Sequence, residues 1–320
     1  MTDPLRRGAT ALAALGTLAL VGCAGPAGST DRTPGAVLQA ANQQALSSSF
    51  KADFTAQLAV NLSRVTPAAG MSAGALGLIQ AEINNLQLRG VLEVQSPKLF
   101  EMSFTLSPLL TQAVHLIDVN GTEYISENGT QWHSQPSTAA GGAGKLSGGL
   151  SNLKSQVDGL GQSLRGEATV KDLGRTGSGS DQVEHIQTSL TGADLNRSWA
   201  SILSTITSDL GAQGGSLSAE LPTIERLVQF TQVTSDSFVL TASGQLARID
   251  TTVGMTLDLS QLAVLAPGQS GLPTGSAGLT LTVRGSFSGY GSNFNIQKPS
   301  HLVPGPLPTP SGLAGALTQA

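Results

Sequence analysis

Apolar and polar residues alternate along several segments of this chain, and the longest such segment runs from residue 50 to residue 63. Its even positions are apolar, whereas most of its odd positions carry polar side chains. Successive side chains of a β-strand point to opposite faces, so this pattern predicts a long strand with one apolar and one wet face. The same period returns at 86–94 and 100–106, and Gly90 is expected at a β-bulge.

Two Asn-Gly pairs, at 120–121 and 128–129, separate short runs of residues that favour strands. Asn and Gly both tolerate a positive φ, which type I′ hairpin turns require at both central positions. The segment 112–133 is therefore predicted to be a β-meander.

Alternation returns near the end of the chain, at 249–259 and again at 279–287. Phe294 and Ile296 predict a last short strand. Regular strands joined by short turns are typical of an antiparallel sheet that has one solvated face and one covered face.

Helices are predicted beside these strands. One begins after Thr33, an N-cap residue followed by proline in the first turn, and an amphipathic helix is predicted at 195–210. The segment 146–164 has helical spacing but contains several glycines, which weaken a helix, so it is predicted to be a mobile helix or a lid. The apolar stretch 71–83 shows no clear helix or strand period, and its structure stays open.

The N-terminal segment has the three parts of a secretory signal. Arg6 and Arg7 precede an apolar run at 9–21, and small residues end this run. The run is shorter than the roughly 18 residues that a membrane-spanning helix needs, so we predict a cleaved signal peptide. Gly8-Ala9-Thr10 stands where twin-arginine signals carry an aromatic residue and a leucine, which favours ordinary secretion.

The signal ends in Leu20-Val21-Gly22-Cys23, which resembles the bacterial lipobox. In that motif the cysteine thiol is alkylated with diacylglycerol, and the cysteine becomes the new N-terminus. Cys23 is the single cysteine of the chain, so no intrachain disulfide is possible. Two acyl chains suffice for stable anchoring. We therefore predict a lipoprotein held on the extracytoplasmic face of the cell membrane; the alternative is an incidental cysteine in a signal cleaved near Ala24 or Gly25.

The composition divides the chain into four parts. Gly, Pro, Ser and Thr dominate the residues after Cys23, as in a flexible tether, and the last stretch is rich in proline, as in a disordered tail. The predicted parts are a signal peptide at 1–22, a lipidated tether at 23–33, a single folded domain at 34–298 and a tail at 299–320.

Charged residues make up 12% of the 320 residues and the formal net charge is -4, so nucleic acid is not an expected partner. The histidines are scattered, and none belongs to a metal-spaced pair or to a Gly-x-Ser-x-Gly elbow. The glycine-rich stretch at 141–145 lacks the Gly-Lys-Ser/Thr ending of a phosphate loop. We therefore predict a protein that is not an enzyme and has no metal or cofactor; a hydrolase with distant Ser, His and Asp is the less favoured alternative.

Three short motifs resemble one known family. They are Val119–Ile125 together with Trp132, the pair Leu173-Gly174, and Ala193-Asp194-Leu195 at the start of a predicted helix. In this order, behind a lipobox, they resemble the actinobacterial LppX/LprA/LprF/LprG lipoproteins. The chain departs from the family pattern in its apolar stretch at 71–83, its glycine-rich stretch at 141–149 and its tail.

The resemblance implies an α+β fold in which a strongly curved antiparallel sheet, a half-barrel, wraps over a few helices. This fold is similar to that of the LolA/LolB-type lipoprotein carriers. Family members bind acylated lipid or glycolipid in an apolar cavity between sheet and helices and help to move it across the envelope. The implied partners are a lipid or glycolipid, the membrane and an envelope transport protein.

The apolar sides of the predicted strands are the candidate lipid site. A lipid cavity is lined mainly by apolar side chains, and aromatic residues are only 4% of the chain, so few large side chains are present to fill a curved sheet. The alternative is an ordinary packed core, in which case the protein acts as an envelope interaction or sensor lipoprotein. The candidates are Phe54, Leu58, Leu88, Leu92, Phe100, Met102, Phe104, Val253, Met255, Leu257, Leu281 and Val283.

Overall fold

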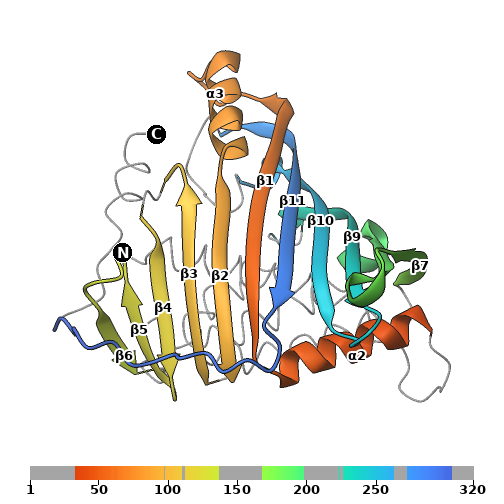
Figure 1. The fold of residues 1–320 in the computed structure, drawn as a ribbon. Helices are drawn as coiled ribbons and strands as arrows, with labels where there is room; N and C mark the ends of the chain where they lie inside the picture. Colours follow the sequence, from red (N-terminus) through yellow and green to blue (C-terminus); the bar gives the residue numbers. More distant parts are fainter. Residues whose placement is uncertain are drawn as a thin grey trace.

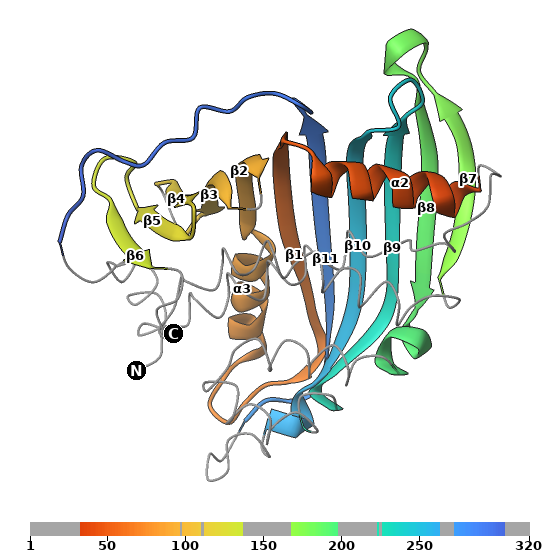
Figure 2. The same ribbon diagram turned by 90° about the horizontal axis from the view of Figure 1, so that it is seen from below.

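Eleven antiparallel strands form one continuous sheet in the computed structural model (Figure 1). The structure describes residues 33–96, 98–109, 112–136, 168–197, 223, 226–262 and 272–304. The strand order is β6-β5-β4-β3-β2-β1-β11-β10-β9-β8-β7, so the sheet is open, with β6 and β7 at its edges. The sheet is strongly curved (Figure 2), which confirms the predicted half-barrel of the α+β class.

The strands follow the chain in two meanders that meet at the first and last strands. Those strands pair along nearly their whole length, from Lys51 opposite Ser288 to Thr66 opposite Thr274. The bounds are β1 (Phe50–Thr66), β2 (Gln87–Ser96), β3 (Leu99–Ser107), β4 (Val114–Val119), β5 (Thr122–Ser126), β6 (His133–Pro136), β7 (Thr169–Thr176), β8 (Val183–Thr191), β9 (Val228–Leu240), β10 (Leu246–Asp258) and β11 (Thr274–Ser288).

Helix α2 (Pro34–Ser47) begins as the sequence predicts. The Thr33 side chain accepts a hydrogen bond from the Ala36 amide at 3.3 Å, and proline occupies the first turn. The helix crosses the half of the sheet that runs from β11 to β7 (Figure 2). Its buried Leu38 and Ala41 pack against buried residues of β8, β9 and β10, namely Ile186, Val239, Leu246 and Ile249.

The apolar stretch between the first two strands forms helix α3 (Ala73–Asn84). β1 extends beyond β2, because the pairing of these two strands ends at Gln57 opposite Gln87. Two side chains of α3 replace the missing strand. Asn84 accepts from the Val60 amide at 2.5 Å and donates to the Val60 carbonyl at 3.3 Å. Gln80 accepts from the Leu62 amide at 2.8 Å, so α3 covers an otherwise open strand edge.

Replacing Asn84 with alanine should lower the free energy of unfolding by about 1–3 kcal/mol, because both backbone groups of Val60 lose their partner. Chemical denaturation measures this loss. Asn85→Ala, at the neighbouring exposed position that caps α3 with its backbone rather than its side chain, is the control. Equal stability of Asn84→Ala and the unmodified chain would show that α3 does not hold the edge of β1.

The two Asn-Gly pairs differ in structure. Asn120 and Gly121 both have positive φ, 53° and 85°, which confirms the predicted type I′ turn between β4 and β5. At the second pair, only Gly129 has a positive φ, 71°. The Asn128 side chain instead accepts hydrogen bonds from the amides of Thr130 and Gln131, at 2.9 and 3.0 Å. The prediction of a second type I′ turn was wrong, because the asparagine side chain organises this turn.

Two further predictions about strands were wrong. Gly90 forms no bulge, because β2 pairs regularly through it with Phe54 of β1 and Phe104 of β3. Residues 294 and 296 lie in an extended segment that pairs with no strand. This segment crosses the lower end of the sheet in Figure 1, and its Ile296 packs with Ile117 and Trp132.

The predicted helix at 195–210 is described only at its start, where residues 192–197 are helical and Leu195 is fully buried. The signal peptide, Cys23, most of the tether, the segment 146–164 and most of the tail lie outside the described residues. None of the described helices is both long enough and apolar enough to cross a membrane.

Candidate functional site

All twelve candidate residues lie on one face of the sheet, the face against which α2 packs, which we call the inner face. Strand pairing places them there: Leu58 lies opposite Leu281, and Leu281 lies opposite Val253. In the other half of the sheet, Leu92 lies opposite Met102. The alternation of side chains therefore collects residues that are far apart in the sequence on a single apolar surface.

The twelve residues differ in burial. Phe100, Val253 and Leu281 have exposed fractions of 2%, 0% and 3%, and they belong to clusters of buried residues, as expected for ordinary core. The other nine are only half-buried. Five of these nine pack against the buried clusters: Leu58, Leu88, Leu92, Met255 and Val283.

The remaining four are Phe54, Met102, Phe104 and Leu257, which belong to none of the buried clusters found in the described part of the chain. Three of them surround Gly90. Phe54 and Phe104 are its partners on the neighbouring strands, and the Phe54 ring lies directly over the glycine. Because glycine has no side chain, the Phe54 ring can occupy the space above it, next to Phe104 and Met102. This part of the inner face, around Gly90 on β1–β3, is the best candidate for contact with an acyl chain.

Two buried carboxyl groups on the inner face were missed by the sequence analysis. Asp118 and Glu123 lie opposite each other on β4 and β5, and both are fully buried. The Asp118 carboxylate accepts a hydrogen bond from the Gly121 amide at 2.9 Å, so it stabilises the hairpin turn. An aspartate two residues before an Asn-Gly turn is a recognisable signal for such a contact.

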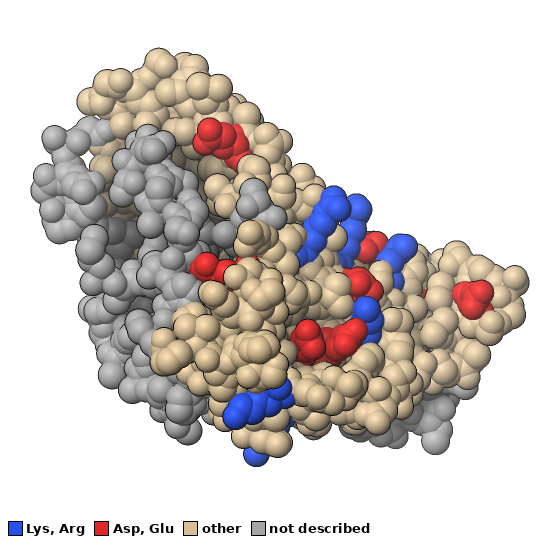
Figure 3. All heavy atoms as spheres, turned by 60° about the vertical axis from the view of Figure 1, so that its left-hand side comes forward, with Lys and Arg blue, Asp and Glu red and all other residues tan. Residues whose placement is uncertain are grey.

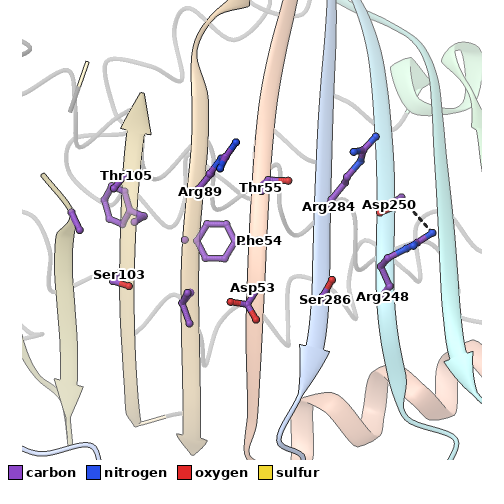
Figure 4. Close-up of a pocket in the computed structure, with 14 residues that line it drawn as sticks. Asp53, Phe54, Thr55, Arg89, Ser103, Thr105, Arg248, Asp250, Arg284 and Ser286 are labelled. Carbon is purple, nitrogen blue, oxygen red and sulfur yellow. Dashed lines mark ion pairs between the residues drawn. The ribbon is translucent and has the colours of Figure 1, made fainter. Parts of the chain in front are cut away.

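The opposite, outer face carries a hollow of about 740 Å³ over β1, β2, β3, β10 and β11, and several charged and hydroxyl-bearing residues line it (Figures 3 and 4). Its lining includes Arg89, Arg248, Arg284, Asp53 and Asp250. Most of the lining side chains come from strand positions that alternate with the candidate residues. Phe54, Gly90 and Phe104 of the candidate surface also contribute to the lining of this hollow, which the sequence analysis did not predict.

Within the hollow, Arg248 is already engaged. Its guanidinium lies 3.2 Å from the Asp250 carboxylate and 3.9 Å from the centre of the Phe238 ring. Phe238 stacks in turn on His185 with 4.4 Å between ring centres. His185 Nε2 lies 2.9 Å from Asp236, and Gln187 donates to the same carboxylate oxygen. His185 is thus held in a polar network, and no group of three or more potential metal ligands occurs among the described residues.

Glu101 on the outer face has a pKa raised above that of an ordinary glutamate, because burial disfavours its charge and Glu93 lies nearby; His115 partly opposes this. At pH values between the pKa of Glu101 in the unfolded chain and its raised pKa in the folded chain, the folded chain binds more protons. The free energy of unfolding therefore falls as pH rises through the raised pKa. Glu101→Gln should therefore raise the melting temperature at neutral pH and give no gain below pH 4.5. Thermal unfolding at both pH values measures this, and an equal gain at both would contradict the assignment.

Two solved structures are similar to the chain over most of its length. One is LprF from Mycobacterium bovis, at 12% identity and a TM-score of 0.39, covering 85% of this chain and 99% of that one. The other is the Mycobacterium tuberculosis lipoprotein LppX, at 10% identity and a TM-score of 0.35, covering 82% and 97%. Both names belong to the family that the sequence resembles. At such low similarity, neither structure assigns a function or a residue role to this chain.

No protein-family model matches the sequence. No curated protein matches it either.

Proposed function

We propose that this chain is a lipoprotein, anchored in the cell membrane through Cys23, whose inner face binds the acyl chains of a lipid or glycolipid and carries them within the envelope. The observation that carries this proposal is the gathering of all twelve apolar candidates on the inner face, nine of them half-buried. An apolar surface on one side of a curved sheet is suited to acyl chains, because these have no polar groups that require hydrogen-bond partners.

Binding would be driven by removal of apolar surface from water. Each methylene group of an acyl chain that becomes buried contributes about 0.8 kcal/mol, so a long chain needs no polar contact to bind firmly. Phe54, Phe104 and Met102 provide aromatic and flexible apolar surface around Gly90. A methionine side chain adapts readily to chains of different shape.

Titration of the purified protein with a fluorescent fatty-acyl probe tests the binding step. We expect saturable binding, with probe emission shifted as in an apolar environment, and competition by unlabelled acylated lipid. Carriage is tested by transfer of a labelled lipid between donor and acceptor vesicles, whose rate should rise with protein concentration. Failure to bind any acyl probe would refute the proposal and favour the interaction or sensor lipoprotein.

Cys23→Ala should release the protein from membranes without unfolding it, because the anchor is lost while the folded domain is untouched. Fractionation of cells into membrane and soluble parts measures the release. Ser29→Ala, in the same tether, is the matched control and should stay with the membrane. Retention of the Cys23 variant on membranes would tell against the lipid anchor.

A further inference from the structure

The outer face contains two arginines without an acidic partner among the described residues, on either side of one threonine. Arg89 of β2 and Arg284 of β11 are each the direct neighbour of Thr55 of β1. Figure 4 shows the three side chains in a row across the hollow. Adjacent strands lie about 4.8 Å apart, so the backbones of the two arginines are separated by roughly 10 Å. Arginine side chains are long enough for both guanidinium groups to reach one anion held above Thr55.

No ion pair within the described part of the chain neutralises either of these guanidinium groups. Asp250, the acid directly opposite Arg284, is paired with Arg248 at 3.2 Å instead. Among the described residues, Arg89 donates to the neutral Gln87 side chain, at 2.9 Å. Two positive charges on either side of one strand repel each other, and an anion bound between them would relieve this repulsion.

The other groups around this row are suited to a phosphate. The hydroxyl-bearing Thr55, Thr105, Ser103 and Ser286 line the same hollow and can donate hydrogen bonds to phosphate oxygens. Three arginines and two aspartates make the hollow locally positive in a chain whose net charge is -4. The planar fork of arginine matches phosphate oxygens in a bidentate manner.

We propose that Arg89 and Arg284, with Thr55 between them, form a binding site for a phosphate ester on the outer face. The two arginines and Thr55 occupy strand positions that alternate with the acyl-binding candidates, so their side chains lie on the other side of the sheet, and the site goes beyond the proposed lipid-carrying function. Phe54, Gly90 and Phe104 line the same hollow. The phosphate ester is either the headgroup of an anionic phospholipid or a soluble phosphorylated compound, and both present the same oxygens.

Binding is measured by calorimetry with inorganic phosphate and glycerol 3-phosphate, and by sedimentation with vesicles of phosphatidylcholine with and without phosphatidylglycerol. The vesicle experiment uses the Cys23→Ala background, so that a lipid anchor does not contribute. The double variant Arg89→Gln/Arg284→Gln should lose about a hundredfold in affinity, tenfold for each guanidinium. Arg175→Gln is the control, because Arg175 is exposed on the edge strand β7, where it pairs with Glu184 at 3.7 Å.

If the double variant loses binding to the soluble phosphates, the ligand is a soluble ester. If it loses binding only to the phosphatidylglycerol vesicles, the ligand is a lipid headgroup. Either result supports the site. Equal binding by the double variant and the unmodified chain in both experiments would overturn it. Displacement of phosphate by polyglutamate at lower concentration than by glycerol 3-phosphate would also overturn it, since an acidic peptide would then be the better ligand. Acyl-probe binding should be unchanged in the double variant, which separates this proposal from the lipid-carrying function.

Discussion

Met102→Lys should weaken binding of a fatty-acyl probe at least thirtyfold and leave the protein folded. Met102 is half-buried on the inner face, beside Phe104 and opposite Leu92. An ammonium group there would either be desolvated by the incoming chain, at a cost of about 2 kcal/mol or more, or keep water on the surface that the chain must cover. Because the position is not fully buried, the lysine can reach water in the free protein, so folding is spared.

The matched control is Ser103→Lys. Ser103 is the next residue of β3, and its side chain points to the outer face, where it lines the hollow. The same added charge should leave acyl-probe binding unchanged at this position. If the two variants bind the probe equally well, the acyl chain does not lie on the inner face of β1–β3.

Gly90→Ala should lower the free energy of unfolding by about 1–3 kcal/mol, as expected for an overpacked site. A Cβ atom at this position would lie 2.7 Å from the Ser103 carbonyl oxygen and 2.9 Å from Cε1 of the Phe54 ring. Real Cβ atoms do not approach other atoms so closely, so the ring must leave its place over the glycine. Thermal unfolding should show a fall of roughly 2–4 °C for each kcal/mol lost.

Gly278→Ala on β11 is the control for Gly90→Ala. There the nearest atom to an added Cβ is the Asn61 Cβ at 3.6 Å, an ordinary contact, so the change should be neutral or stabilise by up to about 1 kcal/mol. In a Phe54→Ala background, Gly90→Ala should cost less, because the ring is gone. Equal melting temperatures for the two glycine variants would show that the packing of the Phe54 ring does not depend on a glycine at position 90.

The strands whose inner positions are large and apolar were predicted from the sequence, as were the N-cap at Thr33 and the type I′ turn at Asn120-Gly121. Strand β9 was missed because two of its buried inner positions are Ser235 and Ser237. Apolar and polar residues therefore do not alternate along this strand. Helix α3 stayed open because it is held by the amide side chains of Gln80 and Asn84 rather than by an apolar stripe. Side-chain hydrogen bonds of this kind produce no regular spacing of apolar residues that a sequence analysis could detect.

The candidate site shows the same limit. The alternation of side chains between the two faces of a strand was enough to place the twelve apolar residues on one face. It could not separate Phe100, which is core, from Phe104, which is half-buried, because burial depends on what lies across the sheet. Arg89 and Arg284 are far apart in the sequence, and only the pairing of both strands with β1 brings them to either side of Thr55. Their juxtaposition therefore required the structure.

Native mass spectrometry of the Cys23→Ala chain, prepared from lipid-rich bacterial cells, tests the central claim most directly. Without the covalent anchor, any added mass reports lipid held noncovalently. We predict that the chain carries acylated lipid, that gentle activation releases it, and that Met102→Lys in the same background carries none. Repeated preparations that show only the mass of the bare chain would contradict the claim that its inner face binds lipid.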